Sequence, residues 1–182
     1  MTKIRLPMPT AEETESVFGS DFNPDETLNG AIALAAAGDL AAPAIALMRA
    51  VFVCPAADAR LRESMILRTA VRLNCTYAVH ASTRIALNSG LSKTEVDALT
   101  AEGTVAGIDP DIVLIARMAD DIADRATLAE GLLEAAIERW GIDNTRKLIL
   151  MLSWFNLVNR YESSCRVSND SDEKLARSSG PT

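Results

Sequence analysis

Signals that start and stop α-helices recur along the chain, and they constrain its fold more than any other feature of the sequence. Asp58, Ser92 and Asp109 each precede an apolar run, where a side-chain oxygen can cap the first turn of a helix. Gly38 and Gly90 follow such runs, at the position where glycine commonly ends a helix. No stretch shows the two-residue alternation of a strand. The sequence therefore predicts an all-α fold, arranged as a compact multi-helix bundle.

These signals divide the chain into an arm, a helical domain and a tail. We expect an extended N-terminal arm over residues 1–22, one helical domain over residues 23–167 and a loosely held polar tail over residues 168–182. Asn74 is expected to cap one helix, and Thr127 with Glu130 to form a capping box for another. The expected helices cover about residues 24–37, 40–53, 59–73, 75–89, 93–101, 110–125, 128–140 and 144–165.

Composition and charge exclude several classes of protein. The net charge of −7 and the lack of a basic run argue against a nucleic-acid partner. The most apolar stretch, residues 31–57, is interrupted by Gly38, Pro43 and Arg49, so it predicts two buried helices and no membrane span. Three dispersed cysteines and an N-terminus without an apolar signal stretch predict a cytoplasmic location. A single histidine and no glycine-rich loop predict neither a metal nor a cofactor.

Glu63 and Cys75 are the first candidates for chemistry. Glu63 lies in an apolar helix, where a carboxyl group needs a partner or a functional reason. Cys75 opens the next helix, where free backbone N–H groups and the helix dipole lower the pKa of a thiol. A carboxyl beside such a thiol is a plausible proton relay. The alternatives are a cysteine that fills the core and a glutamate that pairs with a neighbouring arginine.

The same segment resembles the carboxymuconolactone decarboxylase / alkylhydroperoxidase D superfamily. An Arg- and Glu-rich helix holds Glu63, and eleven residues separate Glu63 from Cys75, as in that superfamily. The apolar run Leu152–Arg160, with aromatic, Asn and Arg residues, is similar to the closing helix of the family. The resemblance covers about residues 25–167. It implies an alkylhydroperoxidase D-like bundle that assembles as a homo-oligomer, either a dimer, a trimer or a hexamer.

The chain departs from the family pattern at two positions. Ala78 replaces the second cysteine, which in the peroxidase branch attacks peroxide, and Ser82 replaces the histidine. His80, the only histidine, points about 140° away from the helix face of Cys75, because successive residues turn by about 100°. A missing redox partner could instead be supplied by Cys54 or Cys165, if either lies near Cys75.

Three functions remain open at this point. The first is a thiol-dependent peroxidase that protects against oxidants, in which Cys75 reacts, Glu63 relays protons and a thiol reductant restores the enzyme. The second is a cofactor-free lyase of the lactone decarboxylase type. In this enzyme Glu63 is acid or base, and Ser82 or His80 helps to orient a small-molecule substrate. The third is a scaffold that binds a small molecule or a partner without catalysis. Further residues expected to bind the substrate are Tyr77, Arg68 and Arg84.

Overall fold

The computed structural model describes residues 4–19 and 22–177, and these residues form helices and loops without a strand. The all-α prediction is therefore confirmed for the described part of the chain. The helices are α1 (Ala11–Phe18), α2 (Asn29–Leu34), the 3-10 helix η1 (Ala35–Leu40), α3 (Ala41–Phe52), α4 (Ala59–Arg72), α5 (Thr76–Asn88), α6 (Lys93–Thr100), α7 (Pro110–Arg125), α8 (Glu130–Cys165) and α9 (Asp172–Arg177).

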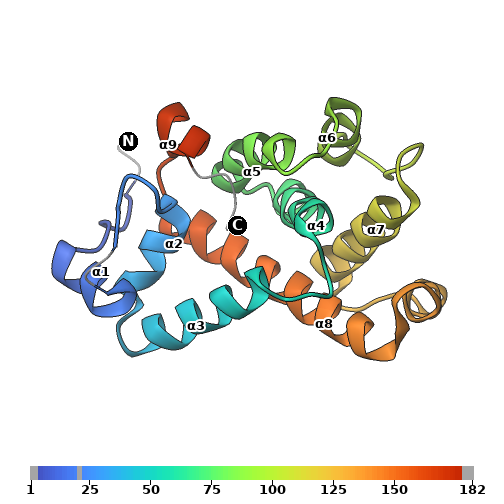
Figure 1. The fold of residues 1–182 in the computed structure, drawn as a ribbon, viewed down its shortest axis with the longest axis horizontal. Helices are drawn as coiled ribbons and strands as arrows, with labels where there is room; N and C mark the ends of the chain where they lie inside the picture. The colour runs from blue at the N-terminus through green and yellow to red at the C-terminus, as the bar shows by residue number, and fades with distance from the viewer. Residues whose placement is uncertain (1–3, 20–21, 178–182) are drawn as a thin grey trace.

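Helix α4 lies at the centre of the molecule and contacts α5, α6, α7 and α8 (Figure 1). Its residues are buried on several faces, so they belong to more than one part of the core. Leu61 and Met65 pack in the large cluster with α3, α7 and α8, whereas Leu67 packs in a second cluster with α6 and α7. Several polar residues of α4, among them Glu63 and Arg68, are therefore buried inside the protein.

Several helix ends lie where the sequence signals predicted them. Asp58 accepts a hydrogen bond from the backbone N–H of Leu61 at 2.8 Å and caps α4. Ser92 and Glu95 form the expected capping box at the start of α6. Gly38 has φ 59° and ψ −131°, and this left-handed conformation, which glycine adopts without strain, breaks the helical backbone between α2 and α3.

Two predicted caps are wrong. Asn74 has a φ of 53°, which asparagine tolerates, and it turns the chain between α4 and α5, so that Cys75 takes the N-cap position. The Thr127–Glu130 capping box does not form, because Ala129 is the N-cap of α8 and donates its N–H to Asp121 at 2.8 Å. The long helix α8 is broken at Gly141, close to where the sequence predicted a boundary.

The two ends of the described chain are more structured than expected. The extended arm contains helix α1, which begins with a capping box of Thr10 and Glu13. The first long helix starts at Asn29 and not near residue 24, because Asn23 holds a turn with its side-chain oxygen 3.0 Å from the N–H of Asp25. In the polar tail, Leu175 of α9 is buried. The last residues of the tail, 178–182, lie outside the described residues.

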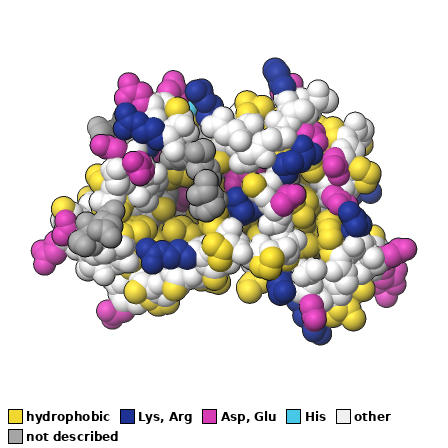
Figure 2. Space-filling model, in the orientation of Figure 1, with side chains coloured by type: hydrophobic (Ala, Val, Ile, Leu, Met, Phe, Trp, Pro, Cys, Tyr) yellow, Lys and Arg dark blue, Asp and Glu magenta, His cyan; other side chains and the backbone are white. Residues whose placement is uncertain are grey.

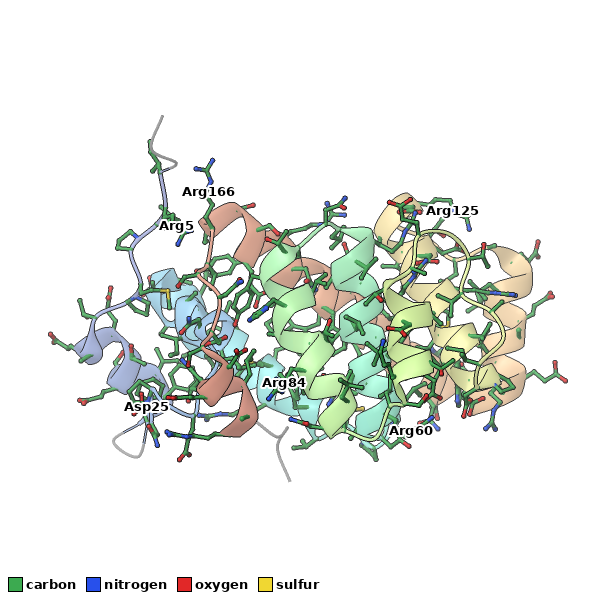
Figure 3. All side chains as sticks on the ribbon, turned by 90° about the horizontal axis from the view of Figure 1, so that it is seen from above. Arg5, Asp25, Arg60, Arg84, Arg125 and Arg166 are labelled. Carbon is green, nitrogen blue, oxygen red and sulfur yellow. The ribbon has the colours of Figure 1, made fainter. Side chains whose placement is uncertain are left out.

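The N-terminal segment lies against the end of α8. Leu6 donates its N–H to the carbonyl of Cys165 at 3.3 Å, and Arg166 donates to the carbonyl of Ile4 at 2.6 Å. Figure 3 shows Arg5 and Arg166 near each other at this end of the molecule. The two ends of the described chain are thus tied to each other on one side of the protein.

By length and composition, Asn29–Phe52 is the one segment among the described residues that could cross a membrane, with a mean hydropathy of 1.8. Its backbone is interrupted at Gly38, and Leu34 and Ile45 pack inside the protein core. Other apolar residues of this molecule are exposed, including Leu150 and Leu157 on α8. Figure 2 shows hydrophobic side chains reaching the surface along the edge that α3 and α8 form.

Candidate functional site

Residues of α2, α3, α4, α5 and α8 line a cavity of about 530 Å³. This volume is within the usual range for sites that bind small molecules. Much of its wall is apolar and comes from Leu34, Met48, Phe52, Ile66, Ile85, Trp154, Phe155 and Val158. Polar groups on this wall have mainly apolar side chains around them, and such surroundings shift the pKa of an ionisable group.

Glu63 of α4 lies in the cavity wall with only 2% of its surface exposed. Its Oε1 is 3.5 Å from Nε of Arg62, an ion-pair contact without a hydrogen bond, and it accepts no hydrogen bond from the described residues. Burial raises the pKa of Glu63 to about 7, although the neighbouring charge of Arg62 acts in the opposite direction. Glu63 can therefore both hold and release a proton near neutral pH.

The guanidinium of Arg62 is held in place by contacts with Phe52. Its guanidinium lies 5.3 Å from the centre of the Phe52 ring, and its Nη1 donates to the carbonyl of Phe52 at 3.1 Å. Phe52 also contacts Phe155 edge to face, with ring centres 6.5 Å apart. This aromatic pair holds Arg62 beside the carboxyl group of Glu63, which also forms part of the cavity wall.

Helix α5 contributes Tyr77, Ala78 and Ser82 to the same cavity. All three are buried, and their spacing places them on the inner face of the helix. The predicted site residues Glu63, Tyr77 and Ser82 are thus brought together by the packing of α5 on α4.

Cys75 does not line this cavity. It is fully buried at the start of α5, and its Sγ lies 3.9 Å from Oε2 of Glu162. Burial raises the pKa of the Cys75 thiol, and the negative charge of Glu162 acts in the same direction. The lowered thiol pKa expected from the start of the helix is therefore contradicted, because burial outweighs the effect of the helix end.

Glu162 of α8 is a second buried carboxyl in the cavity wall, 7% exposed. Burial raises its pKa to about 8, and the charge of Asp170 adds to this effect. Gly30 of α2 makes this arrangement possible, because a Cβ atom at residue 30 would lie 2.0 Å from Oε1 of Glu162 and 2.9 Å from Cε1 of Tyr77. Only glycine lets α2 approach α5 and α8 so closely.

The hydroxyl of Tyr77 links α2 to the C-terminal segment. It accepts a hydrogen bond from the N–H of Gly30 at 2.7 Å and donates one to Oδ2 of Asp170, also at 2.7 Å. Asp170 further accepts from the N–H of Asn29 at 3.0 Å and pairs with Lys174 at 3.2 Å. Burial and these acidic neighbours raise the pKa of Tyr77, so its hydroxyl keeps its proton.

Asn159, one turn before Glu162 on α8, also lines the cavity and is 2% exposed. Its Nδ2 donates to the carbonyl of Phe155 at 2.7 Å, whereas its Oδ1 has no hydrogen-bond partner among the described residues. The contact with the Phe155 carbonyl fixes which side-chain atom is nitrogen, because two oxygens would repel each other there. Asn159 therefore offers an unused hydrogen-bond acceptor inside the protein.

Residues 38–121 match the model of the carboxymuconolactone decarboxylase family. We call this segment, which is less than half of the chain and is similar to that family, the family domain. The resemblance predicted from the sequence is confirmed over this segment, which is shorter than the predicted extent of residues 25–167. No protein of known, curated function matches the chain.

The family domain contains Glu63 and the α5 residues of the cavity, including Ala78 and Ser82 at the positions where the superfamily pattern has its second cysteine and its histidine. The opposite wall lies outside the matched segment. Gly30, Asn159 and Glu162 come from helices that precede or follow it. The matched segment thus supplies one side of the cavity only.

Three of the predicted site residues lie away from the cavity of the family domain. His80 and Arg84 are exposed on α5, and Figure 3 shows Arg84 at the surface. Arg68 is fully buried on α4, where its Nε pairs with Asp120 at 2.6 Å and its Nη1 donates to the carbonyl of Ala101 at 2.9 Å. These contacts give Arg68 a role in tying α4 to α7 and to the loop after α6.

Cys54, Cys75 and Cys165 are all free thiols, and no group of histidine, cysteine and acidic residues suited to a metal is found within the described residues. The sequence analysis did not select Asn159 or Glu162. A signal was present, because both polar residues interrupt the apolar face of the last helix at helical spacing. Arg49, which lines the cavity from α3, also interrupts an apolar run and was not selected as a site residue.

Proposed function

We propose that this protein is a cofactor-free acid–base enzyme of the decarboxylase type, acting on a small and mainly apolar acid. One observation carries the proposal: Glu63 lies in the wall of an apolar cavity, its Oε1 accepts no hydrogen bond from the described residues, and its pKa is about 7. A group with a pKa near the working pH is the best donor and acceptor of protons. The superfamily match supports this class of reaction.

In the proposed reaction, protonated Glu63 protonates carbon. The bond between the substrate and its carboxylate breaks, and the electron pair moves into a conjugated carbonyl as carbon dioxide leaves. The Glu63 proton then goes to the carbon of the resulting enolate, and the ionised Glu63 regains a proton from water. No oxidant or reductant is consumed, so the step needs neither a second cysteine nor a histidine.

The other groups of the wall support binding of an acid. Arg49 and Arg177 are exposed residues of the cavity lining, and they supply positive charge for a substrate carboxylate at its outer side. Ser82, buried near the inner side, offers a hydroxyl that can donate to the substrate carbonyl. The apolar wall keeps water out, which strengthens these polar contacts.

The proposal is tested by a screen of small lactone acids and conjugated keto acids, with released carbon dioxide as the signal. Glu63→Gln should lower kcat by roughly 100-fold or more, because the variant has no proton to transfer at this position. Glu134→Gln, an exposed residue of α8, is the matched control and should leave turnover unchanged. Equal turnover by wild type and Glu63→Gln would refute the proposal. A protein that binds these acids without turnover would instead support the non-catalytic scaffold.

The thiol-dependent peroxidase with a thiol reductant remains a second prediction, with less support. Its reactive residue, Cys75, has a raised thiol pKa and does not line the cavity. A thiol count before and after peroxide treatment tests it, since loss of the Cys75 thiol during turnover would favour the peroxidase. The cytoplasmic location and the homo-oligomer predicted from the sequence also remain predictions.

A further inference from the structure

The polar groups of the cavity are not evenly distributed between its inner and outer sides. Asn159 and Glu63 are each 2% exposed and belong to the inner side, whereas Arg49 and Arg177 are exposed residues. The exposed lining thus includes two positively charged donors, together with the carboxyl group of Glu26. Among the inner groups, Asn159 offers its Oδ1 as an acceptor, because its amide nitrogen is the side that faces the Phe155 carbonyl and donates to it.

An unused acceptor is costly in this position. A buried polar atom without a partner destabilises a protein by about 1–3 kcal/mol, so nearly all such atoms in folded proteins are satisfied. Thr145, also buried on α8, follows this rule and donates to the carbonyl of Ala136 at 3.0 Å. Oδ1 of Asn159 has no such partner in the described protein, and its side chain forms part of a cavity wall.

We infer that Asn159 binds a hydroxyl group of the substrate, so that the substrate is a small apolar acid that carries a free O–H. This inference rests on the proposed function for the acid group, but the hydroxyl contact depends on Asn159 alone. The Oδ1 atom would accept the hydroxyl hydrogen at the inner side, beside the apolar side chains of Phe155 and Val158. The contact would hold the substrate with its reacting carbon on the Glu63 side of the cavity.

A neutral hydroxyl fits this place better than a charged amine. An ammonium group would need an ionised carboxylate, and Glu63 and Glu162 both have pKa values raised by burial, to about 7 and about 8. Near neutral pH Glu162 is therefore mostly protonated and Glu63 is about half protonated, so neither supplies a full negative charge. An ether oxygen would be rejected, because it has no hydrogen to donate and would face the oxygen of Asn159.

The test uses three probes with the same apolar body: 2-cyclohexylethanol, its methyl ether and 2-cyclohexylethylamine. Binding is followed by the fluorescence of Trp154, which lines the cavity, in a Trp140→Phe background so that one tryptophan reports. The alcohol should bind roughly tenfold more tightly than the ether, since an acceptor left without a partner costs about one factor of ten or more. Asn159→Leu should remove this preference by weakening the alcohol and not the ether.

Two further variants separate this inference from the proposed function. Asn156→Leu changes a neighbouring asparagine of α8 that bonds Arg160 and does not line the cavity, so it should keep the preference for the alcohol. Glu63→Gln should also keep the preference while it abolishes turnover. If Glu63→Gln loses turnover but the cavity shows no preference for the alcohol, the hydroxyl contact alone is refuted. If the cavity prefers the alcohol but Glu63→Gln keeps full turnover, the acid–base proposal alone is refuted.

The comparison of alcohol and ether needs no change to a residue of the cavity, because Trp140, the residue replaced in the background, does not line it. Equal binding of these two probes, tighter binding of the amine than of the alcohol, or a preference that survives in Asn159→Leu would each overturn the inference. If Asn159→Leu is poorly folded, Asn159→Ser provides the second variant, because its shorter side chain keeps a hydroxyl but withdraws it from the cavity. It should reduce the tenfold preference to at most about twofold.

Discussion

Replacing Glu63 by glutamine should make the protein more stable at high pH while it removes the proposed activity. Burial holds the pKa of Glu63 at about 7 in the folded protein, against an ordinary value of 4.5. Between these values the native state binds more protons than the unfolded chain, so stability falls as the pH rises. The contribution is fully present below about pH 4.5 and is lost as the pH rises through about 7. Glutamine, which stays uncharged, avoids this loss.

The expected size follows from the two pKa values. One pKa unit corresponds to about 1.4 kcal/mol, so the free energy of unfolding of the wild type should fall by about 3 kcal/mol relative to Glu63→Gln between pH 4.5 and pH 8. Because Glu63 is only 2% exposed, solvent screening should reduce this value little. The two proteins should be equally stable near pH 4.5, where both side chains are neutral.

Urea unfolding at a series of pH values, followed by far-ultraviolet circular dichroism, measures this difference. The buried Glu162 titrates in both proteins, so its effect cancels in the comparison. Glu134→Gln, exposed on α8, should show the pH dependence of the wild type. A constant difference across the pH range, or a wild type that is the more stable protein at pH 8, would mean that Glu63 is ionised and paired with Arg62. Its proposed role as a proton donor would then fail.

Three further predictions concern other parts of the structure. Gly30→Ala should destabilise the protein by about 1–3 kcal/mol in thermal unfolding because of its close contacts, whereas Gly131→Ala, with nothing within 4 Å of the added Cβ, should be neutral or stabilising. Cys75 should react with iodoacetamide far more slowly than the half-buried Cys54 in the native protein, and equal labelling by mass spectrometry would contradict its burial. Leu157→Glu should reduce the mass found by sedimentation equilibrium if the exposed leucine belongs to the predicted homo-oligomer, and an unchanged mass would exclude it from the interface.

The sequence predicted the helices more reliably than the site, and the reason is the range of the interactions involved. The caps at Asp58 and Ser92 depend on residues within three positions, so a local pattern is sufficient to predict them. The capping box predicted at Thr127 failed because a distant group, Asp121, bonds the backbone at the start of the helix instead. A local sequence pattern does not show that a group elsewhere in the chain will bond the same end of a helix.

The residues of the candidate site also differ in how well the sequence predicted them. Glu63 was selected as a carboxyl group in an apolar helix and Ser82 from the family pattern, and both line the same cavity. The thiol pKa of Cys75 was predicted in the wrong direction, because the sequence shows the start of the helix but not the depth of burial. Asn159 was not selected, since an unused acceptor is a property of the folded protein and not of a sequence pattern.

The cavity combines helices from both ends of the chain, and this has a consequence for how the protein can be shortened or recombined. A fragment limited to residues 38–121 would contain Glu63 and Ser82 but would lack α2 and α8. Glu63 would then face water, and its pKa would return toward that of an ordinary glutamate. The part of the chain by which the family is recognised holds the acid, but the helices beyond that part help to set its pKa and complete the cavity that surrounds it.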